Sequence, residues 1–305
     1  MPSSISNSRG DTAILRAIAL AAAIVITTLY ALLIAVWAPD VRSGQDQGSD
    51  NAIAIEHFLY GKPPVAAIVG SSQAERFPAG ALGPDIANLA LAGQNPLVGL
   101  SIIARSGRVP RRIYVEINHV DQPIDTALVD SVFAEPGYTL KRFVAALRTG
   151  YQPVNLAVSL LRRVTRGRDD AHYAYLVDPP LHDILIARQR LMLTQPPDPA
   201  LLQANLAGIS RLAAELSGRG AELIFFEMPI DPELEATPAV VALRRAVRTA
   251  FPSGKACWNE DAAPAGLPST DGIHLDSDTA AGFWARLAAT DCGHGPVSAE
   301  VPERP

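Results

Sequence analysis

One short apolar stretch does most to constrain how this chain folds. Residues 66–69 contain only alanine, isoleucine and valine, with two prolines shortly before them and Gly70 directly after. An unbroken run of small and β-branched residues is typical of a strand covered on both faces, as in a parallel sheet. Ligands of such sheets bind at the carboxyl ends of the strands. Ser71 and Ser72 follow this strand and therefore stand where chemistry is expected.

Strand-like and helix-like patterns alternate along most of the chain. Strand patterns cover residues 65–69, 88–92, 111–117, 221–228 and 256–258, and helical patterns cover residues 96–105, 201–216, 240–250 and 277–289. This alternation predicts an α/β fold with a parallel central sheet and helices on both faces. Residues 121–199 interrupt it with helical patterns alone. We interpret them as a helical insert that serves as a lid, as a docking surface for a partner, or simply as packing.

An uncharged stretch, residues 17–38, lies ahead of this region. At about 1.5 Å per residue, a helix of this length crosses the ~30 Å hydrocarbon core of a membrane. We interpret it as an uncleaved anchor and not as a signal peptide, because the long apolar run ends at Trp37 without a small-residue cleavage site. Arg9 and Arg16 precede it, so the positive-inside rule places residues 1–16 in the cytoplasm. The expected product is a single-pass inner-membrane protein with a periplasmic or otherwise extracytoplasmic domain.

The composition supports one globular domain, residues 61–292, behind the anchor. Of the 305 residues, 48% are hydrophobic and 19% charged, and the net charge of −5 gives no reason to expect a nucleic-acid partner. Residues 39–60 are predicted to be a polar tether, and residues 293–305 a disordered tail.

Two small groups of residues leave alternatives open. The arginine-rich run within residues 162–168 is either a solvated face or a contact for phospholipid headgroups or an anionic glycan. Cys257 and Cys292 either form a disulfide, as an extracytoplasmic setting permits, or stay as two core thiols. No second ligand pair at zinc spacing accompanies Cys292, so we expect no metal site, and no pattern implies a cofactor.

A second polar cluster, near the other end of the chain, contains the residue types that would activate one of these serines. An activated serine requires an imidazole within hydrogen-bond reach, and that imidazole requires a group that fixes its tautomer. Asp271 and His274, three residues apart, supply both. The alternatives are that a serine of the pair only caps the following helix, and that His274 is a loop residue beside a helix N-cap. His119 is the nearest rival base.

Four sequence blocks, in this order, resemble those of the SGNH (GDSL-like) hydrolases and acyltransferases. They lie at residues 70–72, 88–94, 115–119 and 271–274, and the resemblance covers roughly residues 65–290. It implies that Ser72 is the nucleophile and that Asp271 and His274 complete the triad. Gly93 and Asn118 match the residues that help to stabilise the oxyanion in this family. The resemblance also implies a flavodoxin-like, three-layer α/β/α sandwich.

The departures from the family pattern point to one branch of it. Ser71 stands where the family has aspartate, and the glycine that usually precedes the asparagine block is missing before Asn118. With the anchor and the insert, these departures are similar to the membrane-anchored branch, which includes the D-alanyl transfer protein of teichoic acid synthesis and alginate-type polysaccharide acetyltransferases. This implies acetyl transfer to a cell-surface or exported polysaccharide, from an acyl-ester substrate and with a membrane-bound O-acyltransferase as partner. A non-catalytic assembly or glycan-binding factor, and a plain carboxylesterase or lipase, remain as alternatives.

Overall fold

The computed structural model describes residues 8–166, 179–253, 255–259 and 267–290. Contacts divide the chain into two compact units. The anchor unit comprises Met1–Ile53 and Ala134–Leu161, and the sheet unit comprises Ala54–Phe133 and Arg162–Pro305.

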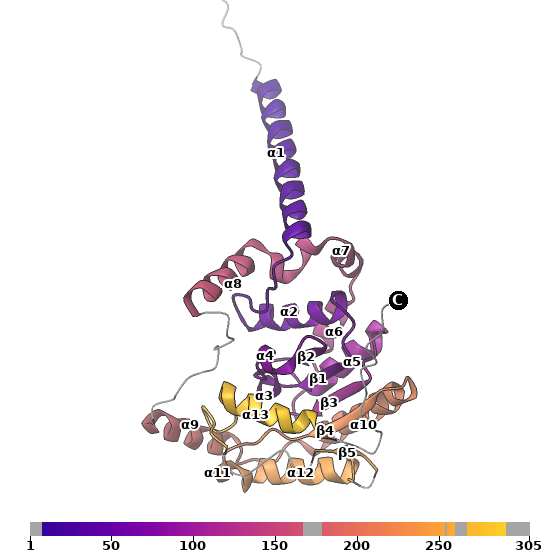
Figure 1. The fold of residues 1–305 in the computed structure, drawn as a ribbon, viewed down its shortest axis with the longest axis vertical. Coiled ribbons are helices and arrows are strands. Elements are labelled where there is room, and N and C mark those ends of the chain that lie inside the picture. Colours follow the sequence, from indigo (N-terminus) through magenta and orange to yellow (C-terminus); the bar gives the residue numbers. More distant parts are fainter. Residues whose placement is uncertain (1–7, 167–178, 254, 260–266, 291–305) are drawn as a thin grey trace, which may run out of the picture. The chain divides into compact units, whose positions relative to one another are not determined.

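The sheet unit is built on a parallel sheet of five strands (Figure 1). They are β1 (Ala66–Gly70), β2 (Ile86–Ala90), β3 (Arg112–Glu116), β4 (Glu222–Phe226) and β5 (Cys257–Trp258), in the spatial order β2-β1-β3-β4-β5. The predicted strands and the predicted α/β class are confirmed. In this order the chain builds β2 on one side of β1 and β3 on the other. The carboxyl ends of β1 and β3 therefore flank the switch point where doubly wound sheets bind their ligands.

Helices cover both faces of this sheet because the strands are apolar on both sides. On one face, Ile68 and Tyr114 share a core with Trp284 of α13 (Ser277–Ala288). On the other, Gly99 of α5 (Pro96–Ser106) packs against Val69, and α10 (Pro199–Gly218) packs against α5 and β4. The other helices of the unit are α3 (Ser72–Glu75), α4 (Ala79–Leu82), α6 (Thr126–Val132), α9 (Pro179–Met192), α11 (Pro232–Glu235) and α12 (Pro238–Ala250).

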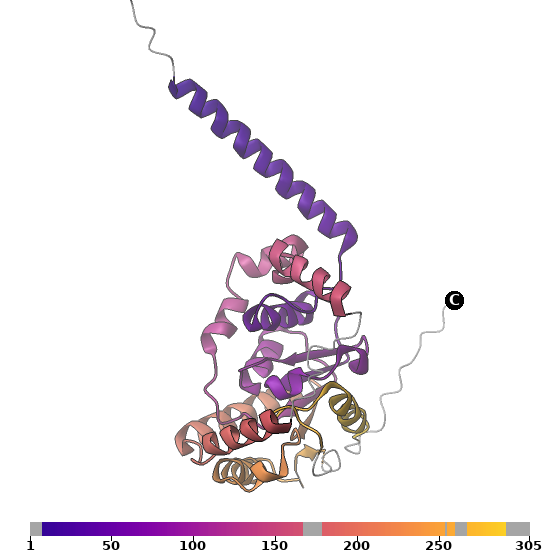
Figure 2. The same ribbon diagram turned by 90° about the vertical axis from the view of Figure 1, so that its left-hand side faces the viewer.

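The anchor unit contains the long N-terminal helix α1 (Ser8–Trp37), which is a single helix in both views (Figures 1 and 2). Its apolar part, Thr12–Trp37, is long enough to cross a membrane. The unit also contains α7 (Gly137–Phe143), the short 3₁₀ helices η1 (Ala145–Leu147) and η2 (Thr149–Tyr151), and most of α8 (Pro153–Arg166).

The predicted tether, residues 39–60, is wrong from Gln47 onward. A helix, α2 (Gln47–Tyr60), begins there, and it crosses from the anchor unit into the sheet unit. Its polar first turn resembles a linker in the sequence, but Ile53, Ile55 and Phe58 are buried. Burial of these side chains stabilises a helix that local composition does not reveal.

The described part of residues 121–199, which leaves out residues 167–178, is mainly helical as predicted, but it is not one module. Residues 134–161 belong to the anchor unit, whereas α6 and α9 belong to the sheet unit. Cys257 is disulfide-bonded, so the alternative of two core thiols is wrong. Its expected partner, Cys292, lies outside the described residues, as do Arg168 and the predicted tail.

Candidate active site

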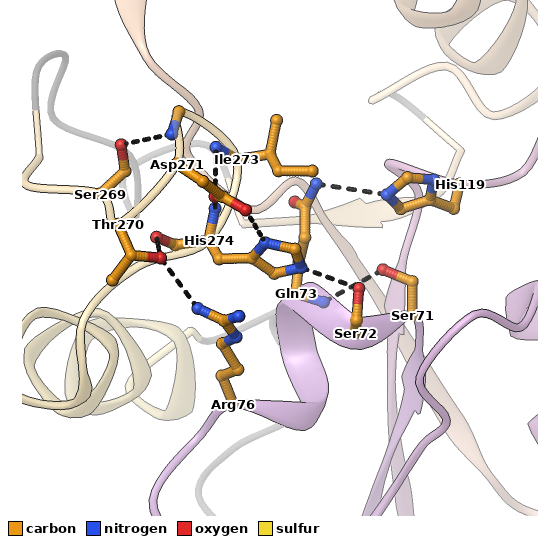
Figure 3. Close-up of polar contacts among 11 residues, drawn as sticks. Ser71, Ser72, Gln73, Arg76, His119, Ser269, Thr270, Asp271, Ile273 and His274 are labelled. Carbon is orange, nitrogen blue, oxygen red and sulfur yellow. Dashed lines mark hydrogen bonds and ion pairs between the residues drawn. The ribbon is translucent and has the colours of Figure 1, made fainter. Parts of the chain in front are cut away.

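Two segments that are far apart in the sequence, one with Ser72 and the other with Asp271 and His274, meet at the carboxyl end of β1 (Figure 3). Ser72 Oγ lies 2.8 Å from Nε2 of His274, and Nδ1 of His274 lies 2.8 Å from Oδ2 of Asp271. Both contacts are hydrogen bonds when Nδ1 carries the ring proton and donates to Asp271, and Nε2 accepts from the serine hydroxyl. This is the arrangement that activates a serine for nucleophilic attack. The structure thus brings the predicted serine, histidine and aspartate together.

A tight loop holds the aspartate and the histidine. Its two sides meet where Thr270 N–H donates to the His274 carbonyl at 2.7 Å, next to a bridge between Ser269 and Leu275. The tip requires Gly272, whose φ of +90° is a conformation that residues with a Cβ rarely adopt. Asp271 Oδ1 accepts from the backbone N–H of His274 at 2.9 Å. The carboxylate is therefore fixed by its own loop before it contacts the imidazole.

These contacts determine the charge state of Asp271. Burial by itself would raise its pKa, because it disfavours the ionised carboxylate. The hydrogen bond and charge of the His274 side chain, together with the backbone N–H groups of His274 and Ile273, act in the opposite direction and prevail. The pKa of Asp271 is thus lowered from its ordinary value, and the group remains an anion that can stabilise an imidazolium.

Two contacts connect this loop to the rest of the sheet unit. The Arg76 guanidinium, at the end of α3, donates to Thr270 Oγ1 at 2.9 Å. The backbone N–H of Asp231, in the segment after β4, donates to the Gly272 carbonyl at 2.7 Å. The helix that carries Ser72 and the loop that carries His274 are therefore linked directly as well as through the triad.

Ser71, the serine before Ser72, forms a different set of contacts. Its backbone N–H donates to Glu116 Oε2 at 2.7 Å, and its hydroxyl donates to Glu116 Oε1 at 2.9 Å. Ser71 Oγ also accepts from Gln73 N–H at 3.2 Å and so caps α3. Ser71 therefore caps α3, whereas the hydroxyl of Ser72 contacts His274.

Glu116, at the end of β3, is a buried residue of this site that the sequence reasoning missed. Its side chain is fully buried and fills the space beside Gly70, where an added Cβ would come within 2.4 Å of Glu116 Oε2. The glycine before the two serines is therefore required by this close approach. A charged residue at the end of an otherwise apolar strand was the signal available, because a buried carboxylate needs dedicated donors.

The two predicted oxyanion residues follow β2 and β3. Gly93 lies in the turn after β2 that Gln94 N–H closes on the Leu91 carbonyl at 3.0 Å. The Asn118 carboxamide forms two hydrogen bonds to the backbone of Met228, donating to its carbonyl at 2.9 Å and accepting from its N–H at 2.7 Å. Asn118 thus joins the ends of β3 and β4, and one amide hydrogen lies outside this pair of bonds. Its role as an oxyanion donor stays a prediction.

His119, the rival base, contacts Gln73 instead, with 3.3 Å between the two Nε2 atoms. Gln73 follows Ser72 directly, is buried, and shows no partner for Oε1 among the described residues. Since carbonyl and amino groups of a glutamine are assigned from their surroundings, the amide can also be placed with Oε1 accepting from His119. The sequence reasoning gave Gln73 no role.

The chain matches no protein-family model, no curated protein and no solved structure. Within residues 8–166, 179–253, 255–259 and 267–290, no group of three or more histidine, cysteine or acidic residues is placed to hold a metal ion. Fold and site together define an α/β protein with a parallel sheet and a Ser-His-Asp arrangement at the sheet's switch point.

Proposed function

We propose that this protein is a membrane-anchored, extracytoplasmic serine acyltransferase or esterase of the SGNH type. The observation that carries the proposal is the pair of 2.8 Å contacts that joins Ser72 to His274 and His274 to Asp271. Ser72, at the start of α3, is partly exposed and not sealed in the core. The strand order agrees with the flavodoxin-like sandwich that the four sequence blocks imply.

The proposed reaction proceeds through an ester on the serine. Ser72 Oγ attacks the acyl carbonyl carbon while His274 Nε2 takes its proton, and Asp271 stabilises the resulting imidazolium. The tetrahedral intermediate then collapses, the donor's leaving group departs with that proton, and the acyl group stays on Ser72. An acceptor hydroxyl then attacks the carbonyl carbon of this ester while His274 Nε2 takes its proton. The bond between the acyl carbon and Ser72 Oγ breaks, His274 returns the proton to Ser72 Oγ, and the acylated acceptor leaves.

The acceptor distinguishes a transferase from an esterase, and the anchor favours transfer. We place the N-terminus in the cytoplasm and the sheet unit outside, where a membrane-held enzyme meets exported or cell-surface polysaccharide. The acyl group is acetyl and the acceptor is a sugar hydroxyl. Because cytoplasmic acyl donors do not reach that side, a membrane-bound O-acyltransferase supplies the acyl group across the bilayer.

The test uses the full chain in membranes, with a serine-reactive fluorophosphonate probe and an activated acetyl ester. Wild type should be labelled and should hydrolyse the ester, whereas Ser72→Ala and His274→Ala should lose nearly all of both activities, because the two residues act as a unit. Ser71→Ala is the matched control and should still be labelled. If acetylated sugar forms after oligosaccharides are added, the protein is a transferase. If acetate released by water is the product even with oligosaccharides present, it is an esterase. If wild type and both variants all show neither labelling nor ester hydrolysis, the proposal that this protein is an enzyme is wrong.

A non-catalytic glycan-binding or assembly factor is the second candidate. It is favoured by the Asn118 carboxamide, because two hydrogen bonds to the backbone of Met228 give this side chain a structural role. Wild type that binds oligosaccharide, yet shows no labelling at Ser72, would select this candidate.

A further inference from the structure

The anchor unit carries a cluster of apolar side chains that the protein does not cover. Within residues 137–151, which we name the juxtamembrane segment, the exposed apolar residues are Leu140, Phe143, Val144 and Leu147. Phe143 is 78% exposed, an unusual state for a phenylalanine. They fall within eight consecutive positions, in α7, in η1 and at Val144 between the two, so they are neighbours along the chain and not residues scattered over the surface.

This segment packs directly on the last turns of α1. Ile34 of α1 is fully buried in a cluster that includes Ala145, Ala146 and Tyr151. The Tyr30 hydroxyl of the same helix donates to the Tyr151 carbonyl. The juxtamembrane segment is therefore attached to the C-terminal end of the apolar helix within one compact unit (Figure 1).

The exposure of α1 indicates the depth at which this contact lies. Every residue from Thr12 to Leu29 is exposed, and protein cover begins at Tyr30. At about 1.5 Å per residue the exposed stretch measures about 27 Å, close to the ~30 Å thickness of a hydrocarbon core. If that stretch fills the core, the juxtamembrane segment lies at the level of the lipid headgroups. Tyrosine is enriched at that level, which agrees with the position of Tyr30.

The charge of the segment suits this level. No acidic residue occurs between Gly137 and Arg168, whereas Lys141, Arg142 and Arg148 lie within the juxtamembrane segment. Arg148 donates to the carbonyls of Lys141 and Arg142 and so closes α7, and Arg142 is exposed. Apolar side chains beside basic ones, without acids, are the composition of segments that lie in a membrane interface with anionic lipids.

We propose that the juxtamembrane segment is a second membrane contact, which inserts Leu140, Phe143, Val144 and Leu147 into the headgroup region around the end of α1. This inference rests on the proposed membrane anchor but not on the proposed catalysis. Its partner is phospholipid, and anionic phospholipid is preferred. The contact holds the base of α1 in a fixed relation to the bilayer, where a lone helix would rotate and tilt freely.

The test places single bimane-labelled cysteines in the full chain, reconstituted in vesicles with anionic and with zwitterionic phospholipid. No described cysteine is free, so the introduced thiol takes the label. In vesicles that contain brominated lipid, a label at Phe143→Cys should lose fluorescence, and more so with anionic lipid. A label at Val241→Cys, an exposed apolar position of α12 in the sheet unit, is the matched control and should be quenched by aqueous iodide instead.

A label at Ile24→Cys, an exposed position of α1, tests the membrane anchor separately from the second membrane contact. Lipid quenching at Ile24→Cys together with iodide quenching at Phe143→Cys would overturn the second contact and leave the anchor standing. No lipid quenching at either position would overturn both. Ester hydrolysis by Phe143→Cys should equal that of wild type in every case, so failure of the catalytic proposal is seen independently.

Discussion

The turns after β1 and β3 lie at the same edge of the sheet, but their polar side chains have different tasks. After β1, the backbone N–H and the hydroxyl of Ser71 donate to Glu116. The hydroxyl of the next residue, Ser72, contacts His274 instead. After β3, the carboxamide of Asn118 itself joins two strand ends through Met228. After β1, one serine holds the turn and its neighbour is left to contact the histidine, whereas after β3 a single side chain, Asn118, holds the turn itself.

Ser71→Asp should have the largest effect on stability, although it recreates the Gly-Asp-Ser pattern of the resembled family. The new carboxylate would face the buried Glu116, and one of the two acids would have to take up a proton. We expect the free energy of unfolding to fall by about 3 to 4 kcal/mol at neutral pH. Chemical unfolding followed by fluorescence of the buried Trp258 and Trp284 measures this change.

The double variant Ser71→Asp/Glu116→Gln checks the cause. With one charge removed, the acid at position 71 can accept from the amide introduced at position 116, and most of the lost stability should return. If the double variant is no more stable than Ser71→Asp alone, repulsion between carboxylates is not the reason that serine occupies this position.

Glu116→Ala should have the second largest effect. It leaves the backbone N–H and the hydroxyl of Ser71 without their acceptor in a buried place, and we expect a loss of about 2 to 3 kcal/mol. The control is Glu215→Ala, which removes a half-exposed ion pair to Arg219 and should cost less than about 0.5 kcal/mol. Equal unfolding midpoints for the two variants would show that the turn after β1 does not depend on Glu116.

The sequence predicted the triad better than the surroundings of the triad, for a physical reason. Ser72, Asp271 and His274 belong to short blocks that resemble the pattern of a known family, and such blocks can be recognised from the local sequence. Glu116 acts through a contact with Ser71, 45 positions earlier, and no local pattern records that pairing. Strands were predicted to within two residues because burial on both faces leaves a local apolar run.

The helices that were missed show the same limit. α2 begins with polar residues and is held by the burial of Ile53, Ile55 and Phe58, which depends on distant partners. Likewise, the division of residues 121–199 between two units follows from tertiary contacts that composition does not encode. The local sequence predicts where helices and strands form, whereas their packing partners depend on tertiary contacts along the whole chain.

Asn118→Ala sharpens the comparison between the two turns, and its effect on stability ranks third. Loss of both bonds to Met228 should cost about 1 to 2 kcal/mol of unfolding free energy. If the remaining amide hydrogen also serves the oxyanion, kcat should fall by about 10² to 10³ with KM little changed. Asn118→Asp keeps the acceptor for Met228 N–H and removes the donor. If Asn118→Asp turns over substrate at the wild-type rate, Asn118 does not donate to the oxyanion and its role is structural only.

Asp271→Asn extends the comparison to the loop, and its expected effect on stability is the smallest. Because the folded state lowers the pKa of Asp271, its ionised form contributes stability that is present above the ordinary pKa of aspartate, about 3.9. That contribution disappears as the pH falls through the lowered pKa of the folded state.

Wild type should therefore exceed Asp271→Asn in unfolding free energy by on the order of 1 kcal/mol at neutral pH, and the difference should vanish in acid. Asp130→Asn, at a mostly exposed surface pair with Arg105, is the control and should change stability little at any pH. A difference at Asp271 that does not shrink as the pH falls below the ordinary pKa of aspartate, about 3.9, would mean that the aspartate acts through shape and not through charge. The loop would then resemble the turn after β3, where a side chain joins backbone segments, more than the turn after β1.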